Sequence, residues 1–339
     1  MIKLDIKGIK GNKYLYLREN LKVNSKSLVV ALYCGRLDKI TRSGFAGKLG
    51  EFAKLKITKY LEYRTCQYAS SFFDPAEIAA LERMRFYYAE FTELYTDESS
   101  RYAESVFVRY VQGTTAIEGN TISPQEAGEL LEHNISPAGK NVSEVYEILN
   151  FVKLRDFLKE YEGDVSEKLV KAMHRILMAD LMRSPGEYRR VQVGIEKVDY
   201  APPPAILIPE MMKDLAAWYR KNSRKIHPFE LAVLLHAKFE LIHPFPDGNG
   251  RVGRALMNFV LERAGYPALY LGLSRRTAYL DAFTAADDED FVPMMKALHR
   301  IYLDQHAPVM DQVRNTLETE SEKTPAFRSV MKEFSRLKR

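Results

Sequence analysis

Residues 243–254 read His-Pro-Phe-Pro-Asp-Gly-Asn-Gly-Arg-Val-Gly-Arg, and this stretch carries most of the functional information in the chain. It places one histidine, one carboxylate, two arginines and an amide flanked by glycines in a single short loop. Glycine tolerates positive φ and close approach, so backbone N–H groups of this loop can converge on an anion. Residues 252–261 are predicted to form a helix, whose amino end would direct unpaired N–H groups to the same point. The pattern therefore predicts a polyphosphate site beside a proton acceptor.

The side chains of this stretch suit different steps of one reaction. His243 could accept a proton from an incoming hydroxyl, and Asp247 could hold a divalent cation that bridges phosphates. Arg251 and Arg254 are three residues apart, so they share one face of the first helical turn. Singly, these residues are more often a packed imidazole, a turn former and solvated arginines. Their combination at these spacings favours the functional interpretation.

The stretch resembles the signature of the Fic family, His-x-Phe-x-Asp/Glu-Gly-Asn-Gly-Arg-x-x-Arg, at every fixed position. Fic proteins transfer the AMP part of ATP onto hydroxyl side chains of target proteins. The resemblance implies that His243 is the general base and that Asp247 ligates Mg²⁺ on the α- and β-phosphates. It also implies an anion cradle formed by Gly248, Asn249 and Gly250. Arg251 and Arg254 would contact the outer phosphates.

An upstream segment, Thr114 to Asn120, fits the inhibitory pattern of the same family, Ser/Thr-x-x-x-Glu-Gly/Asn. The resemblance implies an inhibitory helix over residues 101–120, of the type that precedes the core. Glu118 would pair with Arg254 in the place of the ATP γ-phosphate, and a bidentate carboxylate–guanidinium pair is strong. The alternative is an ordinary helix that stops at Gly119.

Two further regions are assigned through the resemblance. Residues 188–208 are expected to form a short β-hairpin flap, because Val191, Val193 and Ile195 alternate and prolines follow. In the family such a flap docks the backbone of the target by strand addition. Tyr279, which follows the predicted motif helix, is the preferred residue for the adenine end of the ATP site.

The chain as a whole is expected to be mainly α, with a Fic-type helical core, the flap, and a small N-terminal module that contains strands. Capping signals at Asp74-Pro75-Ala76-Glu77 and at Ser123-Pro124-Gln125-Glu126 predict helices that begin there and run through residues 88 and 131. Apolar spacing predicts further helices at residues 143–161, 166–182, 228–242, 278–285 and 291–302. Strands are predicted near residues 14–17 and 28–33, with a turn at Asn24-Ser25. The expected domains are a basic module at 1–70, the Fic domain at 74–310, and a helical tail at 311–339.

Composition limits the class of protein. The 339 residues are 46% hydrophobic with a formal charge of +5. Residues 1–70 hold 15 lysines and arginines against 5 acidic residues, so this module could bind nucleic acid or an acidic surface, although no nucleic-acid motif is evident. Two scattered cysteines do not form a zinc motif or a disulfide framework. We expect a cytoplasmic protein without a membrane partner.

The expected function is AMP transfer from ATP, with Mg²⁺, to a Ser, Thr or Tyr hydroxyl of an unidentified target protein. Self-modification and a homodimer remain open. The alternatives are removal of AMP with Glu118 orienting a water, transfer of another phosphate-containing group, and a nucleotide-binding regulator that associates with nucleic acid through its N-terminus. An intact His243 and Asp247 favour the transferase over the regulator, since a pure binder needs no base.

Overall fold

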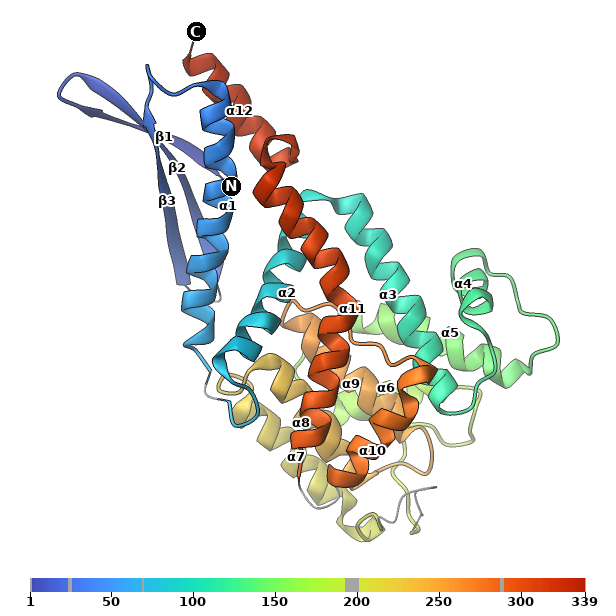
Figure 1. Ribbon diagram of the computed structural model, residues 1–339. Helices are drawn as coiled ribbons and strands as arrows, with labels where there is room; N and C mark the ends of the chain where they lie inside the picture. The colour runs from blue at the N-terminus through green and yellow to red at the C-terminus, as the bar shows by residue number, and fades with distance from the viewer. Residues whose placement is uncertain (1, 24–25, 69, 193–200, 287–289, 339) are drawn as a thin grey trace. The chain divides into compact units, whose positions relative to one another are not determined.

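The computed structural model describes residues 2–23, 26–68, 70–192, 201–286 and 290–338 (Figure 1). The described residues are mainly helical with one three-stranded antiparallel sheet, so the predicted fold class is confirmed. The chain divides into two compact units: the first unit holds residues 1–68, 73–100 and 306–339, and the second unit holds residues 69–72 and 101–305. The domains expected at 1–70, 74–310 and 311–339 stay a prediction. In the part that the structure describes, no helix is both long and apolar enough to span a bilayer.

The sheet of the first unit has the strand order β1-β2-β3. Its strands are β1 (Lys3–Ile9), β2 (Asn12–Val23) and β3 (Lys26–Arg36). The two predicted strands lie inside β2 and β3, whereas β1 was not predicted. Its sequence shows why: the apolar Leu4 and Ile6 alternate with charged residues over too short a span to stand out. The turn expected at residues 24–25 lies outside the described residues.

Three α-helices lie wholly within the first unit: α1 (Arg42–Thr65), α2 (Pro75–Leu94) and α12 (Pro325–Leu337). Helix α2 begins as predicted, because Asp74 and Glu77 form a capping box ahead of Pro75. Helix α1 contacts β2 and β3, and α12 contacts β1. The core includes Phe45 stacked on Phe334 at 4.2 Å between ring centroids. A short 3₁₀ turn, η3 (Ser321–Lys323), precedes α12.

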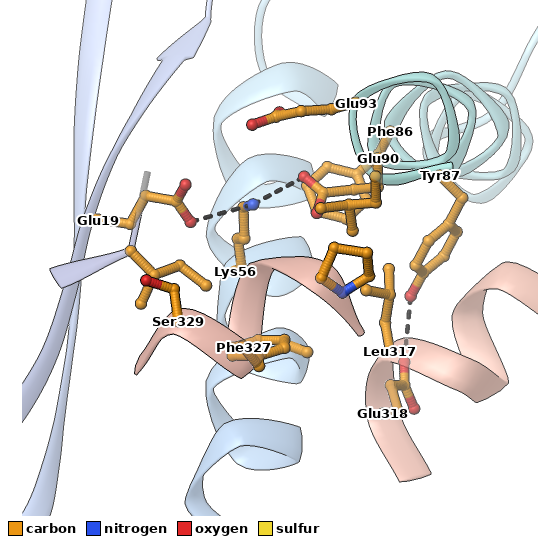
Figure 2. Close-up of a pocket in the computed structure, with 14 residues that line it drawn as sticks. Glu19, Lys56, Phe86, Tyr87, Glu90, Glu93, Leu317, Glu318, Phe327 and Ser329 are labelled. Carbon is orange, nitrogen blue, oxygen red and sulfur yellow. Dashed lines mark hydrogen bonds and ion pairs between the residues drawn. The ribbon is translucent and has the colours of Figure 1, made fainter. Parts of the chain in front are cut away.

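A cavity of about 270 Å³ lies within the first unit, and Figure 2 shows its lining. Lys56 reaches into it between Glu19 and Glu90, at 3.0 and 2.7 Å from their oxygens. Burial disfavours the lysine charge, but the two carboxylates outweigh that effect and raise the pKa of Lys56. The buried cation is therefore compensated on both sides.

The helices of the second unit position the stretch at 243–254. They are α4 (Pro124–His133), α5 (Val142–Glu160), α6 (Glu167–Leu177), α7 (Ile208–Asn222), α8 (Pro228–Ile242), α9 (Asn249–Arg263) and α10 (Arg276–Ala286), with η1 (Ala205–Leu207) and η2 (Leu273–Arg275). Helices α3 (Thr96–Ile117) and α11 (Val292–Thr319) continue from one unit into the other along the chain. Helix α8 is buried on nearly every side, as its continuous apolar sequence predicts.

Three predicted helix boundaries were wrong. The helix expected over 166–182 ends at Leu177, because the carbonyls of Leu177 and Ala179 accept hydrogen bonds from the Asn150 amide instead. The helix expected over 291–302 continues to Thr319 and includes Pro308. The helix expected from residue 252 begins at Asn249, because Gly248 is its left-handed N-cap.

Candidate active site

The candidate loop joins two buried helices. Helix α8 ends at His243, which caps it in the left-handed region at φ 48°, and α9 starts after Gly248 at φ 78°. The Asn249 side chain closes the loop through two hydrogen bonds to the Phe245 backbone. Its amide donates to the Phe245 carbonyl at 2.8 Å, and its oxygen accepts the Phe245 N–H at 2.9 Å. This amide therefore shapes the loop, and only its backbone is available for the predicted anion cradle.

The structure brings Glu118 to Arg254, as the sequence predicted. Glu118 follows the end of α3, and its Oε1 accepts from Arg254 Nη2 at 2.6 Å. The predicted bidentate geometry was wrong: Nε donates to the Thr114 hydroxyl at 2.7 Å, and Nη2 also donates to the Thr114 carbonyl at 3.1 Å. Burial disfavours the carboxylate, but the positive charge of Arg254 and its hydrogen bond hold the pKa of Glu118 below its usual range. Glu118 is therefore ionised at neutral pH.

Gly250 makes this approach sterically feasible. A Cβ at this position would lie 2.5 Å from Glu118 Oε1 and 2.9 Å from Arg254 Nη1. Any larger residue would displace the carboxylate or the guanidinium. The glycine that the sequence assigns to an anion cradle therefore already borders a bound anion, which is a carboxylate of the chain itself.

Arg251 is also held by carboxylates. Its Nη1 donates to Glu147 Oε1 at 2.9 Å, and its Nη2 lies 3.3 Å from Asp247 Oδ1. The second oxygen of Glu147 accepts from the Asn120 amide at 2.8 Å. Glu147 thus links the segment that carries Glu118 to the candidate loop. Sequence reasoning missed it, because one glutamate within a helix carries no spacing signal.

His243 is suited to accept a proton. Burial and the nearby charge of Arg189 lower the pKa of His243 to about 4, so the imidazole is neutral at pH 7. Its Nδ1 is buried, and among the described residues it has no hydrogen-bond partner. An uncharged imidazole is the form that a general base needs.

Arg189 fixes the position of the loop from outside the motif. It is 2% exposed, its Nε donates to the His243 carbonyl at 2.9 Å, and its backbone N–H donates to the Pro244 carbonyl at 2.9 Å. Its Nη2 also donates to the Pro203 carbonyl at 2.5 Å, at the far end of the segment predicted as the flap. The strand predicted over 191–195 falls largely on residues 193–200, outside the described residues. The sequence offered no sign of this role, since an arginine after a turn is usually solvated.

A chain of buried polar groups extends from His243 away from the loop. Glu240 Oε2 lies 3.9 Å from His243 Nδ1, and Glu240 Oε1 lies 3.9 Å from His236 Nδ1. His236 Nε2 is 2.7 Å from the Tyr279 hydroxyl, and the Tyr279 ring centroid is 6.0 Å from the Arg254 guanidinium carbon. Burial raises the pKa of Glu240 to about 8, Arg254 opposes that shift, and Glu118 adds to it. Tyr279, predicted at the adenine end, is 3% exposed and belongs to this chain.

Asp247 is the most open of these carboxylates. Its side chain is 66% exposed, and its Oδ1 accepts the Gly248 N–H at 2.6 Å. No group of three or more His, Cys, Asp or Glu residues could hold a metal within the described residues. One exposed carboxylate fits Mg²⁺, which commonly binds one or two carboxylates together with phosphates and water.

The comparison with known families agrees with this geometry. Residues 164–261 match the Fic/DOC family. This part of the chain is therefore a Fic domain. The match extends from just before α6 into α9 and contains the whole candidate loop, whereas Glu118 lies before it.

Two curated relatives and one solved structure are similar to this chain. The protein adenylyltransferase fic-1 of Caenorhabditis elegans is 31% identical over 205 residues, 58% of this chain and 40% of that protein. The protein adenylyltransferase Fic of Nematostella vectensis is 28% identical over 206 residues, 59% of this chain and 48% of that protein. The chain thus spans less than half the length of these relatives. A Fic family protein from Desulfovibrio desulfuricans shares the fold, with a TM-score of 0.60 and 24% identity over 76% of this chain and 78% of that one.

Proposed function

We propose that this protein transfers AMP from ATP to a hydroxyl side chain of a target protein, and that Glu118 inhibits the transfer. The contact between Glu118 and Arg254 at 2.6 Å carries the proposal, because a guanidinium at the start of a helix that holds a carboxylate is equally suited to hold a terminal phosphate. The relatives named protein adenylyltransferase support the same reaction.

The chemistry assigns His243 to the incoming group. Its neutral imidazole takes the proton of the target hydroxyl as that oxygen attacks the α-phosphorus of ATP. The new bond joins the target oxygen to the α-phosphorus, the bond from that phosphorus to the bridging oxygen breaks, and pyrophosphate leaves. Arg189 is a positioning residue in this scheme, since it holds the His243 carbonyl rather than a substrate.

Binding of the nucleotide falls to the start of α9. The backbone at 248–250, Arg251 and Arg254 would hold the phosphates, and Asp247 would hold Mg²⁺. The cation, when bound, neutralises phosphate charge. Tyr279 would act behind Arg254, because its buried hydroxyl faces His236. The flap at 188–208 would present the target backbone.

Inhibition follows from competition for one guanidinium. While Glu118 occupies Arg254, the γ-phosphate loses its partner and meets a like charge, so ATP binds with its phosphates misplaced. A bias of about 2.7 kcal/mol toward this arrangement would keep about 99% of molecules inhibited.

The test is mass spectrometry of the purified Glu118→Gly variant after incubation with ATP and Mg²⁺. We expect one added AMP on the protein itself, with a rate about tenfold to a hundredfold above wild type. Two controls in the same background should lose the product: His243→Ala, which keeps ATP binding, and Arg254→Ala, which removes the contact that is freed. An intact rate in Glu118→Gly, His243→Ala would contradict the proposal, as would an added group other than AMP.

The reverse reaction is separable in the same assay. Glu118 is 31% exposed, so its carboxylate could also orient a water. If Glu118→Gly leaves the forward rate unchanged but abolishes removal of AMP from a modified protein, Glu118 is part of a hydrolytic site and the inhibitory account fails.

A further inference from the structure

The sheet of the first unit has one packed face and one exposed face. Leu15, Leu17 and Val30 point to the packed face and have no exposed surface. Because successive side chains alternate across a strand, the residues between them point the opposite way. We call this opposite side the outer face and define it by Lys7, Tyr14, Tyr16, Arg18, Lys22 and Tyr33.

Three tyrosines form a cluster on the outer face. Tyr16 and Tyr33 are paired across β2 and β3, with ring centroids 5.3 Å apart. Tyr14 lies 6.2 Å from Tyr33 by the same measure. A register shift between Leu15 and Tyr16 brings these rings together. Tyr33 is 49% exposed, Tyr14 and Tyr16 are partly exposed, and nearby Val29 is 48% exposed, so the cluster presents aromatic and aliphatic surface to water.

Basic side chains surround this cluster. Lys7 Nζ lies 4.9 Å from the Tyr16 ring centroid, and Arg18 and Lys22 continue along β2. Asp5, 4.0 Å from Arg18, is the acidic residue among the outward positions of the three strands. Glu19 points to the other side and is buried against Lys56. Of the two acidic residues in the three strands, one lies on each face, so the outer face carries a single carboxylate against Lys7, Arg18 and Lys22.

We propose that the outer face binds single-stranded nucleic acid, with bases stacked on Tyr16 and Tyr33 and phosphates held by Lys7 and Arg18. Aromatic rings bordered by cations suit a strand whose bases are unpaired, because each base then offers a π-face and each phosphate a charge. In a duplex the base faces are covered by stacking on neighbouring bases, so the tyrosine rings would have no base face to stack on. An acidic peptide would pair with the cations and leave the aromatic surface uncovered. This surface is independent of the proposed transferase.

The first experiment measures binding of the full chain to a fluorescent oligo-dT of about 12 nucleotides, within the site size of single-strand binders, by anisotropy. At about 50 mM salt we expect a dissociation constant in the micromolar range, weakening as salt is raised because counterions are released from the phosphates. A duplex of the same length serves as the competing ligand, and oligo-glutamate serves as the acidic peptide.

Variants separate stacking from charge. Tyr33→Ala should weaken binding on the order of tenfold, whereas Tyr33→Phe keeps the ring and should bind like wild type. Lys7→Glu with Arg18→Glu should weaken binding at least as much and flatten the salt dependence. The matched control is Lys159→Glu with Lys213→Glu, two exposed lysines of α5 and α7. Thermal melting of each variant checks the fold, which should persist because these side chains point outward.

Each outcome decides the proposal. Tighter binding of oligo-dT than of duplex or oligo-glutamate, lost in Tyr33→Ala and kept in Tyr33→Phe and in the control pair, supports it. Equal or tighter binding of the duplex overturns the single-strand assignment. Unchanged binding in Tyr33→Ala, an equal loss in the control pair, or no binding at about 100 μM, the weak limit of non-specific binders, overturns the site itself.

Discussion

Two buried arginines pair with glutamates at nearly the same distance but in different surroundings. Arg64 Nη2 lies 2.7 Å from Glu82 Oε1, and Arg254 Nη2 lies 2.6 Å from Glu118 Oε1. The Glu82 side chain has no exposed surface, and its other oxygen accepts the Tyr60 hydroxyl at 2.6 Å. The Glu118 side chain is 31% exposed. The distance between the paired atoms therefore does not tell a structural ion pair from one whose carboxylate another anion can replace. The exposure of the carboxylate does.

The difference has a physical reason. Loss of an enclosed carboxylate leaves a buried charge with no anion to replace it, which is strongly unfavourable. A half-open carboxylate can yield its cation to another anion that arrives from solvent. The first pair belongs to the stability of the first unit, and the second is suited to control a reaction.

The largest effect should come from the enclosed pair. Glu82→Ala should lower the free energy of unfolding by about 3–5 kcal/mol, because the buried Arg64 then loses the carboxylate that balances its charge. Glu118→Gly should lower it by no more than about 1–2 kcal/mol, since Arg254 keeps its bonds to Thr114. Urea denaturation measures both. Equal losses of unfolding free energy in the two variants would show that exposure of the carboxylate does not distinguish the two pairs.

Charge alone should account for much of the inhibition. Glu118→Gln keeps the shape of the side chain and removes its charge, so we expect a gain in AMP transfer of about tenfold, below that of Glu118→Gly. Glu82→Gln is the matched variant in the other pair and should not change the rate. A rate in Glu118→Gln equal to wild type would show that shape, not charge, blocks the nucleotide.

Asp247 offers a third kind of carboxylate, exposed and only loosely paired with an arginine. Asp247→Asn should weaken Mg²⁺-dependent ATP binding by about tenfold, because a neutral amide is a poorer ligand for a hard cation. Titration calorimetry with and without Mg²⁺ measures this. Asp156→Asn on α5 is the exposed control. Unchanged binding, or activity that persists in excess chelator, would remove the metal from Asp247.

The smallest effect concerns pH. The pKa of Glu240 is raised to about 8 in the fold from about 4.3 in an unfolded chain, so the folded state binds the extra proton. Its contribution to stability is full below the unfolded pKa and is lost as pH rises to about 8, by at most about 1.4 kcal/mol per pH unit. Glu240→Gln should flatten the fall in unfolding free energy between pH 6.5 and 8. Glu262, with a pKa raised to about 7, changes the stability in the same direction. It is present in both the wild type and the Glu240→Gln variant. Identical slopes would show that Glu240 does not titrate in this range.

Local patterns predicted much of the second unit. The capping box at Ser123 and Glu126 starts α4, and the apolar run 228–242 matches α8 at both ends. Boundaries failed where tertiary hydrogen bonds replaced helical ones, as at the end of α6, where Asn150 takes the carbonyls. Strand β1 failed for a similar reason, since its pairing with β2 is a contact that its own sequence barely signals.

The loop at 243–254, its glycines, and the candidate base and cations could be predicted from the sequence, because they depend on residue types at fixed short spacings. It also pointed to Glu118 through a second short pattern. Contacts between residues far apart in the sequence could be seen only in the folded structure, such as Glu147 with Arg251 and Arg189 with the His243 carbonyl. These contacts join residues from different helices and loops or depend on burial, and neither a spacing rule nor a local propensity records which surfaces the chain packs together.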